Sequence, residues 1–425
     1  MGFLATLLLL ITSLLMALLA IMLAGSFWLL WLHVRLRHQG LQHEAGILAM
    51  PLPRELPHVA VQLPVFNEGA IVQRAIRAAA ALDWPRDRLH IQVLDDSTDG
   101  TGELARAAAA EFPDHNITIL HREDRSGFKA GALQAGIGAL PDCDYFAILD
   151  VDYIPPRDFL TRTMRPLLMD PKIAFSQARF DYLNADANAL TRIQAIILDA
   201  HLGVEQATRS WAGHPLPFNG TCGIWRRAAI EAAGGWRGDT LAEDLDLSYR
   251  AWLAGWRGIF LVTVSVPGEL PAEQRAYVAQ QRRWSKGSGE IARRMVSVLQ
   301  GARGMGTQAL LGAILHLGTW WSTPIILLTI PIGIIAAVLN PAVAPALGQA
   351  GLLLATGAEI AVFTMWRLGN RLLRPDELST VEFVLRCLQL QVFGITTILR
   401  NTLAYGEAIL SRKSVFQRTP KQGVN

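Results

Sequence analysis

Two carboxylates with the spacing of a metal-dependent site stand at Asp150 and Asp152, directly after the apolar segment Tyr145–Leu149. An Asp-x-Asp pair at the end of a strand presents one carboxylate toward a nucleotide-linked substrate and the other toward a hard cation. Mg²⁺ and Mn²⁺ prefer oxygen ligands, and Mg²⁺ is often held by one or two carboxylates together with substrate phosphates. Taken alone, the pair fits two solvated turn carboxylates equally well, so the interpretation depends on further residues.

A second acidic pair, Glu243 and Asp244, lies at an expected loop-to-helix junction. In a glycosyl transfer, a carboxylate has to remove the proton of the acceptor hydroxyl as that hydroxyl attacks the anomeric carbon. Asp244 is the candidate for this general base, with Glu243 beside it. The alternative is that acids of a first helical turn complement the helix dipole, and that interpretation suits Asp246 as well.

Groups that fit a diphosphate and a sugar occur in the segment Gln280–Trp284, which reads Gln-Gln-Arg-Arg-Trp. An arginine can neutralise a leaving diphosphate, and a tryptophan offers a flat face to a sugar ring. The alternative is a basic helix that rests on lipid headgroups. Lys129 follows a glycine and opens a helix, where anions bind readily. Asp96 ends a strand and can accept hydrogen bonds from a base or a ribose, unless it only forms an Asx turn.

The elements that must position these residues are short apolar strands alternating with helical stretches. This alternation predicts an α/β fold with a largely parallel, doubly wound sheet, in which ligands bind beyond the carboxyl ends of the strands. We therefore expect Asn67–Glu68, Asp95–Asp96 and Asp150–Asp152 to gather in one crevice. The expected strands are 59–66, 90–97, 117–122 and 145–152, and the expected helices are 69–82, a stretch ending near 110, and 129–140.

Composition bounds the class of protein. Of the 425 residues, 51% are apolar and only 18% are charged, and the charge deficit is confined to the two ends of the chain. The net charge of +3 does not indicate a nucleic-acid partner. The cysteines Cys143, Cys222 and Cys387 are far apart and show no metal-binding spacing, which fits a reducing compartment.

The N-terminal region predicts a membrane span. Residues 3–32 are almost uncharged, and this exceeds the roughly 20 residues that cross a bilayer. The length favours an uncleaved span over a signal peptide. Basic and histidine residues follow the span and none precedes it, which places the N-terminus outside and residue 40 onward in the cytosol. The residues that follow the span are His33, Arg35, Arg37 and His38.

Apolar character returns in the runs 307–339, 342–366 and 381–410. A cytosolic tail requires an even number of crossings, and we expect four, with the first run bent into a hairpin at Pro324. This arrangement places the arginines near 370 outside, against the positive-inside tendency. The alternative is two crossings, with 381–410 lying partly in the interface. The third run also contains Gln389, Gln391 and Arg400, which could line a path for a glycan.

Seven motifs occur in order over about 230 residues and resemble the processive branch of the inverting family 2 glycosyltransferases, which includes cellulose synthases and plant mannan and glucomannan synthases. They are LPVFNE, VLDDSTDGT, R-x-G-x-KAGAL, AILDVDYIP, FNGTCGIWRR, AEDLDL and QQRRW. The resemblance implies a GT-A fold, Mg²⁺ or Mn²⁺ as cofactor and Asp244 as catalytic base. It implies the metal at Asp152 and the nucleotide sugar at Asn67, Glu68, Asp96, Lys129, Asp150, Gln280 and Arg283. It implies the acceptor at Trp284 and in the loop Phe218, Asn219, Gly220 and Thr221.

The segment Phe416–Lys421 resembles the gating loop of the same synthases, in which Thr419 and Lys421 would reach the diphosphate. Arg418 departs from the usual valine of that loop. The alternative interpretation is a disordered basic tail.

The expected organisation is a membrane helix at 1–36, a linker at 37–58 and a GT-A domain at 59–285. An interfacial amphipathic helix at 286–306, membrane helices at 307–410 and a cytosolic tail at 411–425 follow.

The expected function is an inverting hexosyltransferase of the inner (plasma) membrane that extends a β-glycan, translocates it and uses UDP-glucose. GDP-mannose-dependent mannan or glucomannan synthesis is one alternative, and a single transfer to a lipid such as ceramide or diacylglycerol is another. An inactive membrane scaffold is a third interpretation, and the presence of every acidic residue that the chemistry needs argues against it. The expected partners are the nucleotide sugar, a glycan or lipid acceptor, the bilayer and an export protein.

Overall fold

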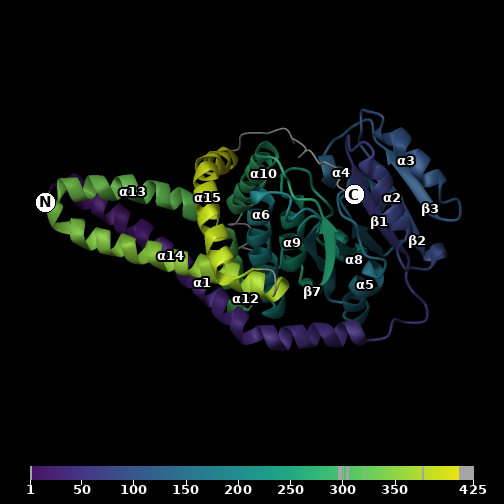
Figure 1. Ribbon diagram of the computed structural model, residues 1–425, viewed down its shortest axis with the longest axis horizontal. Helices are drawn as coiled ribbons and strands as arrows, with labels where there is room; N and C mark the ends of the chain where they lie inside the picture. The colour runs from purple at the N-terminus through teal and green to yellow at the C-terminus, as the bar shows by residue number, and fades with distance from the viewer. Residues whose placement is uncertain are drawn as a thin grey trace.

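A computed structural model describes residues 2–294, 299, 301–302, 306–319, 321–375 and 378–410. It consists of an α/β unit from which a rod of three long helices projects (Figure 1). The rod contains the first part of α1 (Phe3–Ala49) together with α13 (Ser322–Leu339) and α14 (Ala344–Leu373). The predicted gating segment, with Thr419 and Lys421, lies outside the described residues.

One seven-stranded sheet forms the centre of the α/β unit, in the order β3-β2-β1-β4-β6-β5-β7. Strands β1 to β4 pair in parallel, which confirms the prediction for that half, and β5 and β7 are parallel to each other. Strand β6 is antiparallel to both neighbours because the chain re-enters the sheet at the carboxyl end of β4. The strands are β1 Val59–Val65, β2 Leu89–Asp95, β3 Asn116–His121, β4 Tyr145–Ile148, β5 Ile173–Tyr182, β6 Gly223–Arg226 and β7 Arg257–Gly268.

Helices cover both faces of the sheet, because successive side chains of its buried strands point to opposite sides. Val61 and Leu63 belong to one apolar cluster, whereas Ala60 belongs to the cluster on the other face, with Phe146 and Trp225. The helices of the unit are α2 Ile71–Ala80, α3 Thr101–Ala110, α4 Phe128–Gly138, α5 Phe159–Met169, α6 Ala189–Ala200, α7 Ala207–Trp211, α8 Arg227–Ala232, α9 Glu243–Leu253 and α10 Gln274–Arg293; a π-helical turn, His201–Gln206, joins α6 to α7.

Helix α1 extends to Ala49, so the linker predicted at 37–58 is wrong for most of its length. The basic residues after 32 predict a membrane boundary, but nothing in the sequence ends the helix before Pro51. The second part of α1 runs along the α/β unit (Figure 1). There the Glu44 carboxylate accepts hydrogen bonds from the backbone N–H groups of Val262 (2.9 Å) and Thr263 (2.7 Å). These donors lie on the edge strand β7, so the contact covers an otherwise open sheet edge.

The hairpin predicted at Pro324 is also wrong. The 13-residue helix α12 (Thr307–Thr319) is too short to span a bilayer and packs on the α/β unit, where the Tyr249 hydroxyl and His316 Nδ1 are 2.7 Å apart. The turn of the hairpin lies instead at 340–343, between α13 and α14. Among the described residues, three helices are long and apolar enough to cross a membrane, namely α1, α13 and the stretch Pro341–Leu373, and the bent stretch Thr380–Ile409 would be a fourth if it is one span.

The interfacial helix predicted at 286–306 is not a separate element, because 286–293 completes α10 and Lys286 and Ile291 are buried. Much of the remainder lies outside the described residues. The last helix, α15 (Thr380–Ile409), crosses the end of the rod and does not extend it (Figure 1).

The glycan path along α15 stays a prediction, and its three polar residues lie in different surroundings. Gln391 donates to Glu359 of α14 (2.6 Å), whereas Gln389 and Arg400 are exposed on α15, which lies outside the three-helix rod.

We expect Glu44→Ala to destabilise the fold, because the buried Val262 N–H would lose its acceptor at about 1–3 kcal/mol, and the partly buried Thr263 N–H would lose its acceptor too. Thermal unfolding in detergent should show a lower Tm for Glu44→Ala than for Glu44→Gln, which keeps an acceptor oxygen. Equal Tm values for the two variants and the parent would contradict a role for this contact.

Candidate active site

A cleft of about 230 Å³ opens where β1, β2 and β4 end, as predicted for a doubly wound sheet. It brings together most of the predicted site residues from six segments of the chain. Those that line it are Glu68, Asp96, Lys129, Asp150, Asp152, Asn219, Thr221, Gln280, Arg283 and Trp284.

Lys129 links the two acidic groups of the cleft. Gly127 adopts a left-handed conformation (φ 72°) and begins the turn into α4, which carries Lys129. The Lys129 ammonium lies 2.5 Å from Asp150 Oδ1 and donates to the carbonyl of Gly220 at 2.9 Å. Burial alone would lower the pKa of Lys129, but nearby carboxylates, with Asp150 the strongest, raise it overall. Lys129 therefore carries a positive charge in the cleft.

Asp152 is buried, with 4% of its surface exposed, and lines the cleft beside Asp150. The Asp150 N–H donates to the Thr221 hydroxyl (2.8 Å), which fixes the turn that carries both carboxylates. Among the described residues, no three His, Cys, Asp or Glu side chains converge as a complete metal site. These residues fit a Mg²⁺ or Mn²⁺ ion that arrives with a diphosphate, because such ions use one or two carboxylates and substrate oxygens.

The two neighbouring acids of the β2 end have different roles. Arg122 grips both oxygens of Asp96 with Nε (2.7 Å) and Nη2 (2.6 Å), so this carboxylate is held at the cleft. Asp95 accepts from the Ser97 N–H (3.0 Å) and lies 2.9 Å from His121 Nδ1. The Asx turn therefore belongs to Asp95. The sequence analysis missed Arg122, which lies outside the recognised motifs.

Asp244 and Glu243 open helix α9 next to Lys129. A Cβ atom on Gly220 would lie 3.0 Å from Asp244 Oδ2 and 3.9 Å from Lys129 Nζ, so these groups share one small space. Burial raises the pKa of the Glu243 and Asp244 carboxyl groups. The neighbouring Glu243 raises the pKa of Asp244 further, to about 7. A carboxyl group with that pKa can accept a proton near neutral pH.

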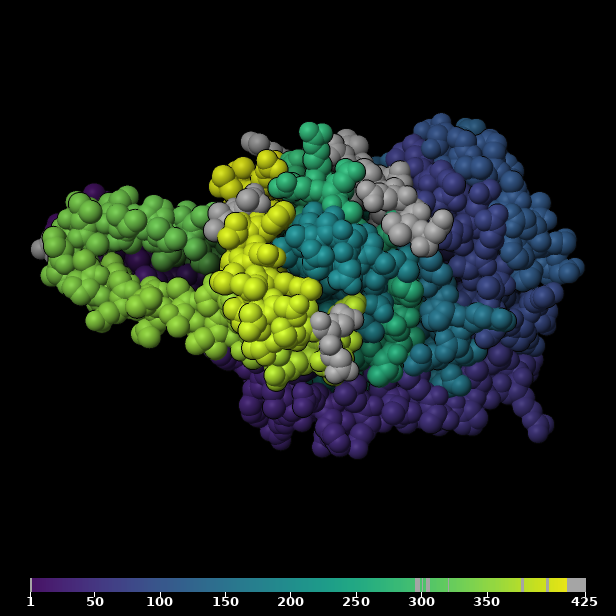
Figure 2. All heavy atoms as spheres, in the orientation of Figure 1, coloured from purple at the N-terminus to yellow at the C-terminus, as the bar shows by residue number. Residues whose placement is uncertain are grey.

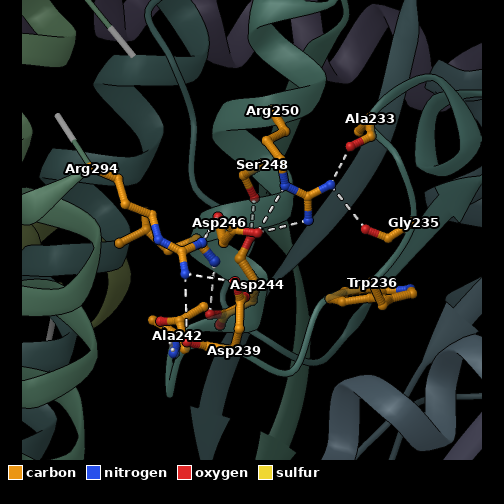
Figure 3. Close-up of polar contacts among 12 residues, drawn as sticks. Ala233, Gly235, Trp236, Asp239, Ala242, Asp244, Asp246, Ser248, Arg250 and Arg294 are labelled. Carbon is orange, nitrogen blue, oxygen red and sulfur yellow. Dashed lines mark hydrogen bonds and ion pairs between the residues drawn. The ribbon is translucent and has the colours of Figure 1, made fainter. Parts of the chain in front are cut away.

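Asp246 is a structural anchor, in agreement with the alternative considered for the acids of this helix. It lies between Arg250 (2.7 Å) and Arg294 (3.0 Å), and Arg294 also binds Asp239 (2.8 Å) (Figure 3). Because Arg294 follows the end of α10, the cluster ties α9 to the helix that carries Gln280–Trp284. The base candidate on α9 and helix α10, which carries Gln280–Trp284, are thus held in one arrangement.

Only part of the loop Phe218–Thr221, which is predicted to bind the acceptor, lines the cleft. Phe218 is 1% exposed and packs against Phe175 and Trp225, so it belongs to the core and the expected acceptor contact is wrong. Gly220 has a φ of 79° and offers only its backbone to the cleft, whereas Asn219 and Thr221 line it. Phe218 is apolar and therefore packs in the core, and the motif alone does not show which way its side chain points.

Asn67 also differs from its prediction. Its side-chain oxygen accepts from the Thr98 N–H (2.8 Å), and its own N–H donates to the Ser97 hydroxyl (3.0 Å). Asn67 therefore joins the loops after β1 and β2 and does not line the cleft, whereas the adjacent Glu68 does.

Helix α10 forms one wall of the cleft, because Gln280, Arg283 and Trp284 lie one helical turn apart on one face. Trp284 is 43% exposed, which leaves an aromatic face for a sugar. Burial lowers the pKa of Arg283, whereas the negative charges of Glu243 and Asp150 oppose that shift. The Arg283 guanidinium therefore interacts electrostatically with both acids.

Two further residues of the cleft escaped the sequence analysis. The Arg125 guanidinium lies 3.3 Å from the ring centroid of Phe66, and both side chains line the cleft near Asp96. Arg125 is the arginine of the R-x-G-x-K motif and Phe66 belongs to LPVFNE, so both could have been singled out.

Residues 57–287 match the family described as glycosyltransferase-like family 2, which covers more than half of the chain. The chain therefore belongs to the family 2 glycosyltransferases. This agrees with the cleft, its acidic pairs and the order of the motifs.

Two curated relatives are similar over the same region. Glucomannan 4-beta-mannosyltransferase 9 of Arabidopsis thaliana is 44% identical over 244 residues, 56% of this chain and 46% of the relative. Glucomannan 4-beta-mannosyltransferase 1 of Oryza sativa subsp. japonica is 44% identical over 245 residues, 56% of this chain and 47% of the relative. The chain thus spans about half the length of the curated relatives it matches.

A solved structure shares the fold. It is a mannosyltransferase from Pyrobaculum calidifontis in complex with GDP-Man and Mn²⁺, with a TM-score of 0.58, 22% identity, and coverage of 94% of this chain and 100% of that one. At this identity the likeness supports the GT-A fold with additional helices.

We expect Gly220→Ala to lower activity at least tenfold, because the added Cβ would displace the Asp244 carboxylate and disturb Lys129. Gly213→Ala is the matched control, since Gly213 also has a positive φ (66°) but nothing lies within 4 Å of the added atom. Sugar transfer and Tm should be measured for both variants. Equal activity in the two variants would show that the space beside Asp244 is unimportant.

Proposed function

We propose that this protein transfers mannose from GDP-mannose, with inversion, to a growing β-mannan or glucomannan chain. The observation that carries the proposal is the convergence of Asp152, Lys129 and Arg283 on one cleft, with Asp244 next to Lys129, in a chain whose curated relatives are named glucomannan mannosyltransferases. These relatives favour mannose over the UDP-glucose expected first from the motifs.

The diphosphate of the donor would lie between three positive charges. Asp152 would hold the divalent cation, which neutralises charge on the leaving diphosphate when bound. Lys129 is kept protonated by its acidic neighbours, and Arg283 faces the cleft from α10. Both side chains can stabilise the negative charge that develops as the glycosidic bond breaks.

Asp244 would act as the general base. Its carboxyl group has a pKa near 7 because it is buried beside Glu243, so it can take a proton from the acceptor hydroxyl. The hydroxyl then attacks the anomeric carbon from the side opposite the diphosphate. An α-linked donor sugar thereby becomes a β-linked product.

The base end of the cleft favours guanine on chemical grounds. Guanine presents N–H donors on one edge, which suit a carboxylate such as Asp96, and the acceptors O6 and N7 on another, which suit an arginine. Arg125 lies at this end, stacked on Phe66 and close enough to feel the charge of Asp96. Uracil has a single ring N–H donor and no counterpart of N7, so it would use this pair less fully.

A lipid acceptor is a second candidate, favoured by a separate observation. An apolar cavity of about 630 Å³ lies between α1, α13 and α14, with Ser26, Thr319, Ser322 and Thr329 as its polar lining. A cavity of this volume and character suits an acyl or prenyl chain. In that case the product would carry one sugar on a lipid.

The membrane arrangement we propose has α1, α13 and α14 crossing the plasma membrane and the α/β unit in the cytosol. Arg374, at the end of α14, pairs with Asp181 (2.7 Å) and Asp199 (3.1 Å) of the α/β unit, so α14 returns to the side of the cleft. This arrangement gives two crossings after the α/β unit. It places Arg367 and Arg371 inside, together with Arg37 after the first span, as the positive-inside rule favours.

The donor and product can be tested together. Purified protein incubated with Mn²⁺ and radiolabelled GDP-mannose, UDP-glucose or GDP-glucose should incorporate label mainly from GDP-mannose into a polymer that β-mannanase degrades. Polymer formed only from UDP-glucose would contradict the proposal. Label found as a single sugar in the lipid extract would favour the lipid acceptor instead.

We expect Asp244→Asn to reduce kcat by roughly 10²–10⁴-fold, the usual contribution of a general base. Binding of GDP, measured by calorimetry, should change little, because Asp244 is assigned to the acceptor side. In the parent protein kcat should rise with pH through about 7 as the Asp244 carboxyl group loses its proton. Retained turnover in Asp244→Asn would remove this residue from the mechanism.

A further inference from the structure

Helix α15 presents three different faces. One face is buried against the rest of the protein, with Phe383, Cys387 and Leu390 packed on Ile193 and Ile196 of α6. A polar flank contains Gln389 and Arg400. The third face is an exposed apolar stripe at helical spacing, and its members, with 43–69% of their surface exposed, are Val381, Val384, Leu385, Leu388, Val392, Leu399, Leu403 and Leu410.

Both ends of α15 are held by the α/β unit. The N-terminal half packs on α6, as described, and the C-terminal half packs on α10, where Gly289 is in close contact with Tyr405 and Ala408. Helices α6 and α10 also carry or support residues of the cleft, so they lie on the side of the membrane where the nucleotide sugar binds. A helix fixed to that unit at both ends cannot have its ends on opposite sides of a bilayer.

We propose that α15 lies in the plane of the membrane surface, with its apolar stripe in the bilayer interface, and holds helix α10 in its working position. Its 30 residues and apolar content would permit a crossing, and its two halves are bent by 50°. Helix α15 lies across the end of the three-helix rod, next to α13 and α14 (Figures 1 and 2), and both of those helices also expose large apolar side chains, such as Ile334 and Leu352. Interfacial helices insert an apolar face into the membrane surface and keep polar side chains on the other side.

Glu407 is the positioning residue through which α15 would act on the cleft. Its carboxylate lies 3.0 Å from Arg282 Nη2 and 3.6 Å from Lys286 Nζ, both on α10. Arg282 directly precedes Arg283 and Trp284, which line the cleft. The bilayer therefore supports α15, α15 supports α10 through Glu407, and α10 presents the arginine and the tryptophan to the substrates.

Topology can be tested without any assumption about the reaction. The native cysteines are buried, so single cysteines introduced at Thr380 and at Arg400, on the polar flank, can be labelled with an impermeant maleimide in sealed vesicles. Both should react from the side that labels Glu103→Cys on the α/β unit, whereas Asn340→Cys, in the turn between α13 and α14, should react from the other side. Labelling of Thr380→Cys and Arg400→Cys from opposite sides would overturn the proposal.

Lipid contact can be tested with two neighbouring residues. A bimane fluorophore on Leu399→Cys should be quenched by brominated lipids at least threefold more than one on Arg400→Cys, because only the first belongs to the apolar stripe. Equal quenching at the two positions, or none at Leu399→Cys, would show that the stripe does not meet the bilayer.

The effect on the cleft needs an activity readout and therefore rests on the proposed function. Glu407→Gln should raise KM for the donor about threefold to tenfold with little change in Tm, and Glu407→Asp should recover part of the loss. Glu103→Gln, on the surface of α3, is the matched control and should be unchanged. An unaltered KM in Glu407→Gln would refute the support of α10, whereas inactivity of every variant and the parent would instead concern the donor assignment.

Discussion

The buried ammonium group of Lys129 is the interaction on which the cleft depends. It binds Asp150 and the Gly220 carbonyl, and it lies close to the two acids at the start of α9. Without this positive charge, carboxylates from two parts of the chain would repel one another in a desolvated space. With it, the end of β4, the loop Phe218–Thr221 and α9 meet at a single point. Under the proposed function, the same ammonium group would also bind the diphosphate.

The surrounding structure protects this arrangement with arginine–carboxylate pairs. Arg122 fixes Asp96, and Asp246 is held between two arginines, so the end of β2 and the start of α9 are anchored by charged contacts that are at least partly buried. Pairs of this kind add little net stability, but breaking one leaves an uncompensated buried charge. Their role here is geometric. The arginines hold the acidic side chains in fixed positions, so repulsion between the carboxylates does not push the loops apart.

Charged side chains also join the long apolar helices to the α/β unit. Arg374 connects the end of α14 to Asp181 and Asp199, and Glu44 connects α1 to the edge of the sheet. The three-helix rod therefore does more than anchor the α/β unit, because its helices continue into contacts with the sheet and with α6. The α/β unit consequently has a defined orientation with respect to the helices that can enter a bilayer.

The sequence by itself determined the alternation of strands and helices, the edge at which the carboxylates gather, and the regions able to enter a membrane. These features depend on local patterns, namely apolar strands with polar residues at their ends and long apolar runs. Only the tertiary structure decided that the Asx turn belongs to Asp95 and that Arg122 holds Asp96 at the cleft. It also decided that Phe218 turns into the core and that β6 runs antiparallel. Those outcomes depend on packing between segments far apart in the chain, and such packing leaves no local signal in the sequence.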